Sequence, residues 1–165
     1  MTKIYLAGGC FWGTQHFVRQ LRGVVSTRVG YANGRTERPT YDQVKYEHTG
    51  HAETVEVVYD ETVLPTKKLL DCYYMTIDPL SMNRQGMDFG VQYRTGIWYE
   101  DDRLAPEVEA SLAELAQKLG RKPAIEHGRL QQFFDAEDYH QDYLVKNPAG
   151  YCHISPELLA RAKEL

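Results

Sequence analysis

The sequence predicts an α+β fold, in which a ferredoxin-like βαββαβ core forms a two-layer sandwich and is followed by a C-terminal extension. Short segments with alternating apolar and polar residues are typical of strands, and segments with apolar residues at helical spacing lie between them. Their order along the chain is strand, helix, strand, strand, helix, strand. With 165 residues and no repeat or linker, the whole of 1–165 is expected to form a single domain.

The first half of the predicted core is strand, helix, strand. An apolar run over 3–7 predicts the first strand. Apolar residues continue at helical spacing as far as Leu21 without a proline, which predicts a helix over 11–21. Alternation over 24–32 predicts the second strand. A loop rich in turn-forming residues then leads to a short helical segment over 41–46.

The second half of the predicted core contains two more strands and one helix. Residues 53–60 have a strong strand pattern, a helix opens at Pro65-Thr66, and 92–99 predict the fourth strand. The connection from 77 to 91 is polar with little periodicity. Because loops of this length in a compact domain are usually functional or disordered, we expect this one to be functional.

The C-terminal extension is predicted to be mostly helical. Residues 106–119 form a helix closed by a glycine, and 124–133 have the pattern of an edge strand. A helix near 137–146 is followed by a loop and then by a last helix, with Ser155 as its N-cap and Pro156 at its first position.

Charge and composition exclude several classes of partner. The formal charge is -4, and the 19 Lys and Arg residues are scattered, so no basic surface for nucleic acid is expected. No segment has the length of a membrane span or of a signal peptide, and we therefore expect a cytoplasmic protein with no membrane partner. Three cysteines without a CxxC pair argue against a disulfide framework and favour a redox or nucleophilic role.

The segment Gly9-Cys10-Phe11-Trp12-Gly13 is the strongest functional signal in the chain. It places a thiol after a predicted strand, at the start of a predicted helix and beside two large aromatic side chains. The helix dipole and the unpaired amides of a helix N-terminus favour a thiolate. From the residues alone two alternatives stay open: Cys10 is a small buried apolar residue, and Phe11 and Trp12 are core aromatics.

Glu53 is the strongest candidate for an acid. It shares one face of its predicted strand with Val55 and Val57, where burial would raise the pKa of the carboxyl, and a neighbouring thiolate would raise it further. A carboxyl that is protonated near neutral pH can act as a general acid. The alternative is a carboxylate turned to solvent. Tyr41 and Tyr93 are two of twelve tyrosines, and residue type alone favours packing roles for them.

The order of short motifs along the chain resembles that of the A-type peptide methionine sulfoxide reductases. The resemblance covers about residues 4–153 and begins with the Gly9–Gly13 segment. It continues through Gly30-Tyr31, Pro39-Thr40-Tyr41, Thr49-Gly50-His51-Ala52-Glu53, Tyr59-Asp60, Asp78-Pro79, Arg84-Gln85-Gly86, Asp88, Gly90, Gln92-Tyr93-Arg94 and the run from Ala136 to Cys152.

The resemblance implies a role for each residue that handles the sulfoxide group. Cys10 is the nucleophile that attacks the sulfoxide sulfur. Glu53, protonated, donates its proton to the sulfoxide oxygen, and Tyr41 and Tyr93 hydrogen-bond that oxygen. This agrees with the chemistry, because a sulfoxide oxygen is a poor leaving group until it is protonated.

The resemblance also implies the residues that bind the rest of the substrate. Phe11 and Trp12 form the apolar pocket for the methyl group, and Asp88 belongs to a polar network on the substrate side. Near Asp88 this chain departs from the family, because Met87, Phe89 and Val91 replace residues that are often polar or smaller there. Ile77 likewise stands where relatives commonly have histidine. The loop is therefore expected to be more apolar than usual.

The resemblance implies a recycling route through Cys152. Attack leaves methionine and a sulfenic acid on Cys10, which condenses with a second thiol to a disulfide. Cys152 resembles the family's recycling cysteine, and thioredoxin is the implied reductant of the Cys10–Cys152 disulfide. A disulfide needs Cα atoms within about 7 Å, so the loop with Pro148 and Gly150 is expected to rearrange. Cys72 is expected to be a core residue.

The expected enzyme is thus an oxidoreductase that reduces methionine S-sulfoxide, both protein-bound and free, in the repair of oxidised proteins. We expect a monomeric catalytic domain without a bound cofactor. The six histidines have no ligand-like spacing, so no metal site is expected. The alternative function is a binding or redox-sensing module on the same fold. Glu53 and Cys152 separate the two, because a binder needs neither an acid nor a recycling thiol.

Overall fold

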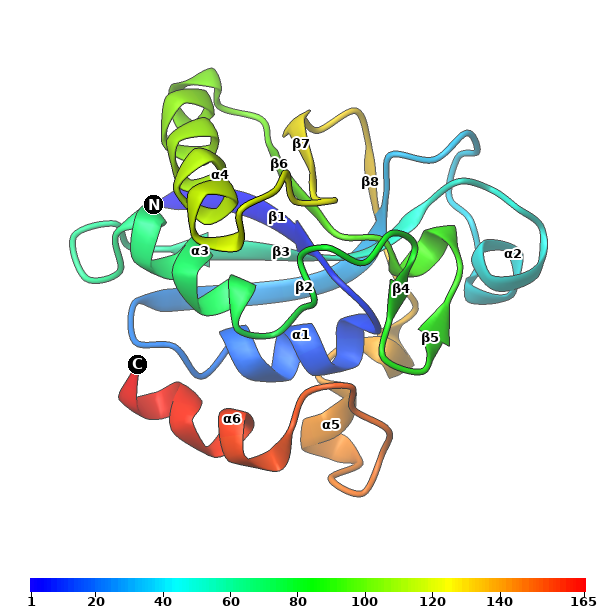
Figure 1. The fold of residues 1–165 in the computed structure, drawn as a ribbon. Coiled ribbons are helices and arrows are strands. Elements are labelled where there is room, and N and C mark those ends of the chain that lie inside the picture. The colour runs from blue at the N-terminus through cyan, green and yellow to red at the C-terminus, as the bar shows by residue number, and fades with distance from the viewer.

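The computed structural model describes residues 1–165 and has a mixed α+β fold around a six-stranded sheet (Figure 1). The strands are β1 (Thr2–Ala7), β2 (Val24–Ala32), β3 (Ala52–Tyr59), β6 (Gly96–Tyr99), β7 (Glu126–Arg129) and β8 (Phe133–Asp135). Their order in the sheet is β7-β6-β1-β3-β2-β8, and every neighbouring pair is antiparallel except β6 and β7. The predicted α+β class is confirmed.

The helices and a small hairpin complete the fold. The helices are α1 (Phe11–Val18), α2 (Tyr41–Tyr46), α3 (Thr66–Tyr74), α4 (Ala105–Leu119), α5 (Tyr143–Lys146) and α6 (Pro156–Arg161), and the hairpin is formed by β4 (Arg84–Gln85) and β5 (Asp88–Phe89). Single 3-10 turns cover Val91–Tyr93, Asp102–Leu104, Asp138–His140 and Ala162–Glu164. None of the helices is long and apolar enough to cross a membrane.

The core lies between one face of the sheet and the helices. Strand residues such as Val55 and Val57 belong to the same buried cluster as Phe17 of α1, Leu69 of α3 and Leu112 of α4. Side chains on neighbouring strand positions point to the opposite face, where a smaller apolar cluster forms. The helices α1, α3 and α4 therefore cover the same face, which leaves the other face to short loops and charged side chains.

The four strands expected from the sequence are neighbours in the sheet. They lie in the order fourth, first, third, second, and each pair is antiparallel. The fourth begins at Gly96 rather than at 92, because residues Val91–Tyr93 form a 3-10 turn before it. The first helix ends at Val18 rather than at Leu21, and Gly23, with φ of 103°, then directs the chain into β2.

Two predictions for the second half of the chain are wrong in detail. The single strand expected over 124–133 is two strands, β7 and β8, at opposite edges of the sheet. The helix expected near 137–146 is broken after the turn at Asp138–His140, because Asp142 has a left-handed backbone with φ of 53°. The last helix is as predicted: Ser155 accepts a hydrogen bond from the Leu158 amide and Pro156 is its first residue.

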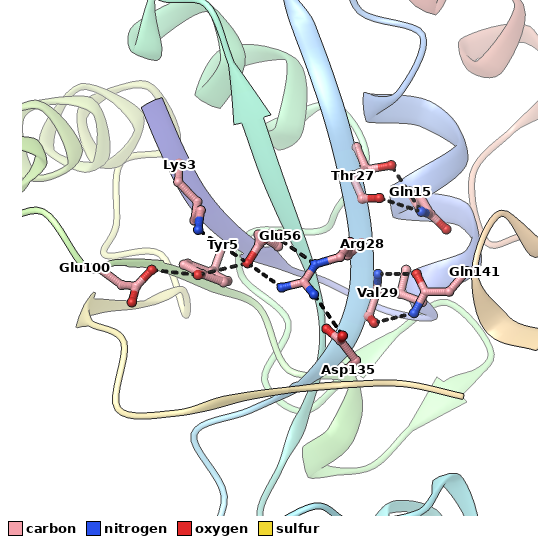
Figure 2. A network of polar contacts seen from close by, with 10 residues as sticks. All are labelled: Lys3, Tyr5, Gln15, Thr27, Arg28, Val29, Glu56, Glu100, Asp135 and Gln141. Carbon is pink, nitrogen blue, oxygen red and sulfur yellow. Dashed lines mark hydrogen bonds and ion pairs between the residues drawn. The ribbon is translucent and has the colours of Figure 1, made fainter. Parts of the chain in front are cut away.

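Two glutamines fasten the C-terminal segment to the core (Figure 2). The side chain of Gln141 pairs with the Val29 backbone as a strand would, accepting from its amide at 2.9 Å and donating to its carbonyl at 2.9 Å. Gln15 of α1 accepts from the Asp142 amide at 2.9 Å and donates to the Thr27 hydroxyl at 3.1 Å. These bonds fix residues 140–143 against α1 and β2.

A charged network on the opposite face ties the strands together (Figure 2). Glu56 of β3 accepts two hydrogen bonds from Arg28 of β2 at 3.2 and 3.1 Å and one from the Tyr5 hydroxyl at 3.0 Å. Arg28 also contacts Asp135 of β8 at 2.8 Å. Although burial raises the pKa of Glu56, the hydrogen bonds and charge of Arg28 hold it below its ordinary value.

The variant Gln141→Leu tests the anchoring of the C-terminal segment. It leaves the Val29 amide without an acceptor, whereas the Val29 carbonyl keeps the Ala136 amide as a donor at 3.0 Å. We therefore expect the free energy of unfolding to fall by about 1 to 3 kcal/mol in urea titrations. The control is Gln131→Leu, since that side chain is exposed and makes no hydrogen bond. Equal stabilities of the two variants would contradict the anchoring role.

Candidate functional site

The candidate site is built around the N-terminus of α1. Cys10 is the N-cap residue of this helix, with an extended backbone, and the preceding Gly9 has a left-handed φ of 77°. The Gly9 amide donates to the Tyr93 carbonyl at 3.1 Å, which links this turn to the segment before β6. The Cys10 side chain is only 8% exposed. The predicted position of Cys10 at a helix start is confirmed.

Glu53 lies beneath this helix N-terminus. It is 2% exposed on β3, and its Oε1 accepts a hydrogen bond from the Phe11 amide at 3.1 Å. Burial raises the pKa of Glu53 to about 8, and the Asp88 carboxylate adds to the effect, while the Phe11 amide opposes it. The predicted burial is confirmed, and the solvent-facing alternative is wrong. At neutral pH the carboxyl carries a proton, and Oε1 is already occupied as an acceptor.

The Cys10 thiol does not have the low pKa that its helix position alone suggests. Burial and the neighbouring Glu53 raise the pKa of Cys10 well above its ordinary value, although an interaction with the Trp12 amide lowers it. The helix N-terminus therefore lowers the pKa of Cys10, as predicted, but burial and Glu53 raise this pKa by more. Without substrate, both Cys10 and Glu53 hold their protons at neutral pH.

Two tyrosine hydroxyls approach the same region from separate elements. Tyr41 is the first residue of α2, and Tyr93 ends the 3-10 turn before β6. Burial and the charge of Glu53 raise the pKa of both hydroxyls, which therefore remain protonated donors. Tyr41 is held by Glu137, whose Oε2 accepts from the Tyr41 amide at 3.0 Å while Oε1 accepts from the Tyr31 hydroxyl at 2.8 Å.

An aromatic cluster surrounds Trp12. Its indole NH donates to Nδ1 of His140 at 2.9 Å, and its ring stacks on Tyr143 with centroids 3.7 Å apart. The His140 ring also lies 5.2 Å from Phe11 and 4.7 Å from Tyr41. Both aromatics of the motif are thus in place beside Cys10. Phe11 is buried in the main cluster, whereas Trp12 is only partly buried.

Asp88 reaches the site from the β4–β5 hairpin. Burial raises its pKa, and the Tyr151 hydroxyl donates to its Oδ2 at 3.1 Å, which stabilises the charged form. The Cys10 amide also interacts with this carboxylate. The long loop from 77 to 91 thus carries a residue of the site, as expected, but it is folded as a hairpin.

Cys152 and His153 pack directly on the two glycines of the motif. A Cβ atom placed on Gly13 would lie 2.9 Å from the Cys152 sulfur and 3.1 Å from Nδ1 of His153. A Cβ atom on Gly9 would lie 2.9 Å from Nε2 of the same histidine. Glycine is therefore needed at both positions to seat the C-terminal segment. All three cysteines are free thiols in this structure.

The structure thus brings Cys10, Glu53, Tyr41, Tyr93, Cys152, Phe11, Trp12 and Asp88 around one helix N-terminus. Cys72 lies apart, buried in the main cluster on α3, as expected for a core residue. No group of three His, Cys, Asp or Glu side chains has metal-binding geometry.

Sequence reasoning missed the residues that support the site: Glu137, His140, Tyr143, Tyr151 and His153. Their partners lie far away in the chain, so no local spacing pointed to them. The nearest signal was the run from Ala136 to Cys152, which contains all but the last of them.

The chain is similar to several known proteins. The family profile described as peptide methionine sulfoxide reductase matches residues 2–164. A peptide methionine sulfoxide reductase MsrA of Lachnoclostridium phytofermentans is 56% identical over 151 residues, which cover 92% of this chain and 91% of that protein. Reduced Mxr1 from Saccharomyces cerevisiae has a similar structure, with a TM-score of 0.87, 37% identity and coverage of 93% and 90%.

A further similar structure is Mxr1 from Saccharomyces cerevisiae in complex with Trx2. Its TM-score is 0.61 at 29% identity, covering 86% of this chain and 83% of that one.

The burial of His153 predicts a pH dependence of stability. Burial lowers the pKa of His153 to about 4, and neither ring nitrogen has a hydrogen-bond partner. An unfolded chain binds the proton near pH 6.5, so the folded state loses stability as pH falls from about 6.5 to 4. We expect urea titrations to show that, between pH 7 and pH 5, wild type loses roughly 2 kcal/mol more than His153→Asn.

The exposed His127 provides the control for this measurement. His127→Asn is expected to keep the pH dependence of the wild type, because its side chain is not buried on folding. If His153→Asn and His127→Asn had the same pH dependence, His153 would not be a buried neutral residue in solution.

Proposed function

This chain belongs to the peptide methionine sulfoxide reductase family, and from that premise we propose how its own residues reduce methionine sulfoxide. It is an oxidoreductase of the A type, and its substrate is the sulfoxide of methionine. We propose that it acts on the S epimer, in proteins and as the free amino acid, and that residues 1–165 form one catalytic domain. The strand order fourth, first, third, second supports a ferredoxin-like description of the central unit.

The buried acid beside the buried thiol carries the proposal. Glu53 is protonated at neutral pH, and its one side-chain hydrogen bond is the one that Oε1 accepts from the Phe11 amide. The proton on Oε2 is therefore available for the sulfoxide oxygen. Protonation weakens the S–O bond at the moment when the Cys10 sulfur attacks, which is where general acid catalysis is effective.

The two tyrosines are proposed to stabilise the oxygen as charge develops on it. Tyr41 and Tyr93 remain neutral donors because burial raises the pKa of both hydroxyls. Donors that are already in place need no reorganisation during the reaction, so they favour the transition state over the ground state. Glu137 contributes indirectly, since it holds the backbone of Tyr41.

The aromatic cluster is proposed to hold the methyl group of the substrate. Trp12 is fixed in orientation by the hydrogen bond to His140 and by the stack on Tyr143, and Phe11 is buried beside it. An apolar wall of this kind binds a methyl group and excludes water from the reacting sulfur. Asp88, held by Tyr151, is proposed to line the polar side of the same pocket.

The reduction balances without a metal or a cofactor. The Cys10 sulfur forms a bond to the sulfoxide sulfur while Glu53 protonates the oxygen. The resulting hydroxyl group then moves to Cys10 as the sulfoxide S–O bond and the transient S–S bond break, and the S–C bonds of methionine are untouched. The proton of the Cys10 thiol ends on the oxygen, so that the products are methionine and a cysteine sulfenic acid, and Glu53 recovers its proton. Methionine sulfur gains two electrons, and Cys10 loses them.

The recycling half of the reaction is proposed to use Cys152 and thioredoxin. The Cys152 thiol attacks the sulfenic acid, which forms a disulfide and releases water, and a dithiol of thioredoxin then reduces that disulfide. Two observations support this order: Cys152 packs against Gly13 of the motif, and the yeast relative forms a complex with Trx2.

Glu53→Gln tests the acid. Because an amide has no acidic proton to donate, the single-turnover rate of sulfoxide reduction should fall about a hundredfold or more, with substrate still bound. In the wild type the rate should fall as pH rises through about 8, where Glu53 ionises. Glu109→Gln, an exposed carboxyl on α4, is the control and should behave as wild type. An unchanged rate in Glu53→Gln would assign the proton to another group.

Mass spectrometry of a single turnover tests the route and excludes a binding or sensing module. After one addition of methionine S-sulfoxide without reductant, wild type should yield stoichiometric methionine and a Cys10–Cys152 disulfide. Cys152→Ser should yield the same methionine with a sulfenic acid on Cys10 and should not cycle with thioredoxin. Cys72→Ser, a buried thiol on α3, is the control and should cycle normally. Absence of both methionine and disulfide in wild type would contradict the enzymatic proposal.

A further inference from the structure

A cleft that the proposed reaction does not use lies beside the site. Its volume is about 550 Å³, and its walls are α2, the turn before β3 and the segment 89–92. The helix α2 begins at Tyr41, and the opposite wall lies between Asp88 and Tyr93. Both walls therefore continue into the site. Figure 1 shows α2 and the β4–β5 hairpin on the side of the sheet where α1 begins.

One wall of the cleft is apolar and exposed. Phe89 is 61% exposed and Val91 is 45% exposed, whereas Val44 of α2 is buried at the back. The guanidinium group of Arg84 lies 4.3 Å from the centre of the Phe89 ring and restricts its movement. Contiguous exposed apolar side chains of this kind at the edge of a site mark a binding surface.

Two other lining side chains are cationic and form no ion pair. Arg35 and Lys45 both line the cleft, neither forms an ion pair, and no acidic side chain lines it. The charge of Lys45 also lowers the pKa of Glu53, so this cation lies within electrostatic range of the site. The cleft therefore offers an apolar surface and unpaired positive charge together.

We propose that this cleft binds the part of a polypeptide substrate that flanks the oxidised methionine, and that it selects an apolar side chain next to an acidic one. The apolar side chain packs on Phe89 and Val91, and the carboxylate meets Lys45 and Arg35. This inference rests on the proposed function, because the sulfoxide itself must occupy the pocket at Cys10. Free methionine sulfoxide fills only that pocket and does not reach the cleft.

The test compares three peptides of equal length, each with one methionine S-sulfoxide at its centre. The flanking residues are leucine and glutamate, leucine and lysine, or serine and glutamine. We measure kcat/KM with dithiothreitol as reductant, so that thioredoxin binding does not contribute. The leucine–glutamate peptide should exceed each of the other two by about tenfold, while free methionine S-sulfoxide sets the reference.

Two variants separate the apolar and the charged contributions. Phe89→Ser should reduce the preference for leucine–glutamate over serine–glutamine to about threefold or less, and Lys45→Glu should reverse the preference for glutamate over lysine. The ratio between two peptides is insensitive to the effect of Lys45 on Glu53, because the same acid serves both. The controls are Met82→Ser and Lys122→Glu, which change exposed side chains outside this cleft and should keep the wild-type ratios.

The possible results distinguish a failure of the cleft proposal from a failure of the proposed function. Equal kcat/KM values for the three peptides, with normal reduction of free methionine S-sulfoxide, would overturn the role of the cleft and leave the proposed function intact. Failure of wild type to reduce any of the substrates would contradict the proposed function. If Phe89→Ser and Lys45→Glu left the peptide ratios unchanged, and a parallel assay with thioredoxin as reductant showed a raised KM for thioredoxin, the cleft would serve the reductant and the inference would be wrong.

Discussion

The hydrogen bond from the Phe11 amide to Glu53 is the contact around which the site is organised. The first backbone amides of α1 lie in a buried part of the core. Each of them needs a hydrogen-bond acceptor there, and Glu53 of β3 is the acceptor for the Phe11 amide. The carboxyl stays protonated because it is buried, and it is buried because the helix begins directly above it. The start of the helix and the acid therefore determine each other's position. Cys10, as the N-cap residue, is placed by the same contact.

The C-terminal third of the chain supports this contact from outside the central sheet. Gln141 and Gln15 fasten the segment to β2 and α1, and His140 then reaches the indole of Trp12. Glu137 uses one oxygen for Tyr31 and the other for the amide of Tyr41. Each of these hydrogen bonds is part-buried and joins residues between 96 and 128 positions apart in the chain. These hydrogen bonds hold the aromatic residues and Tyr41 of the pocket in fixed positions.

The sequence predicts correctly those helices and strands that local residue patterns decide. The strand over 24–32 and the helix over 41–46 are correct, because alternation and turn chemistry decide them. The break at Asp142 and the division of 124–133 into two edge strands could not be predicted, because tertiary contacts decide both. The place of Glu53 on a strand face left burial and solvent exposure both open, and the structure decides for burial. The contacts by which Glu137, His140 and His153 support the site could not be predicted, because they depend on how distant segments meet. The raised pKa of Cys10 also required the structure, because burial outweighs the helix terminus.

Cys152 and His153 pack on Gly13 and Gly9, so this contact joins segments about 140 residues apart in the chain. A protein that is synthesised from its N-terminus makes Cys10 well before the groups that cover it. During translation the helix N-terminus, the nucleophile and both glycines precede the histidine and the second thiol that seal them. The emerging chain therefore carries Cys10 without its cover, and the site is complete only after Cys152 and His153 have been synthesised and have packed on the two glycines.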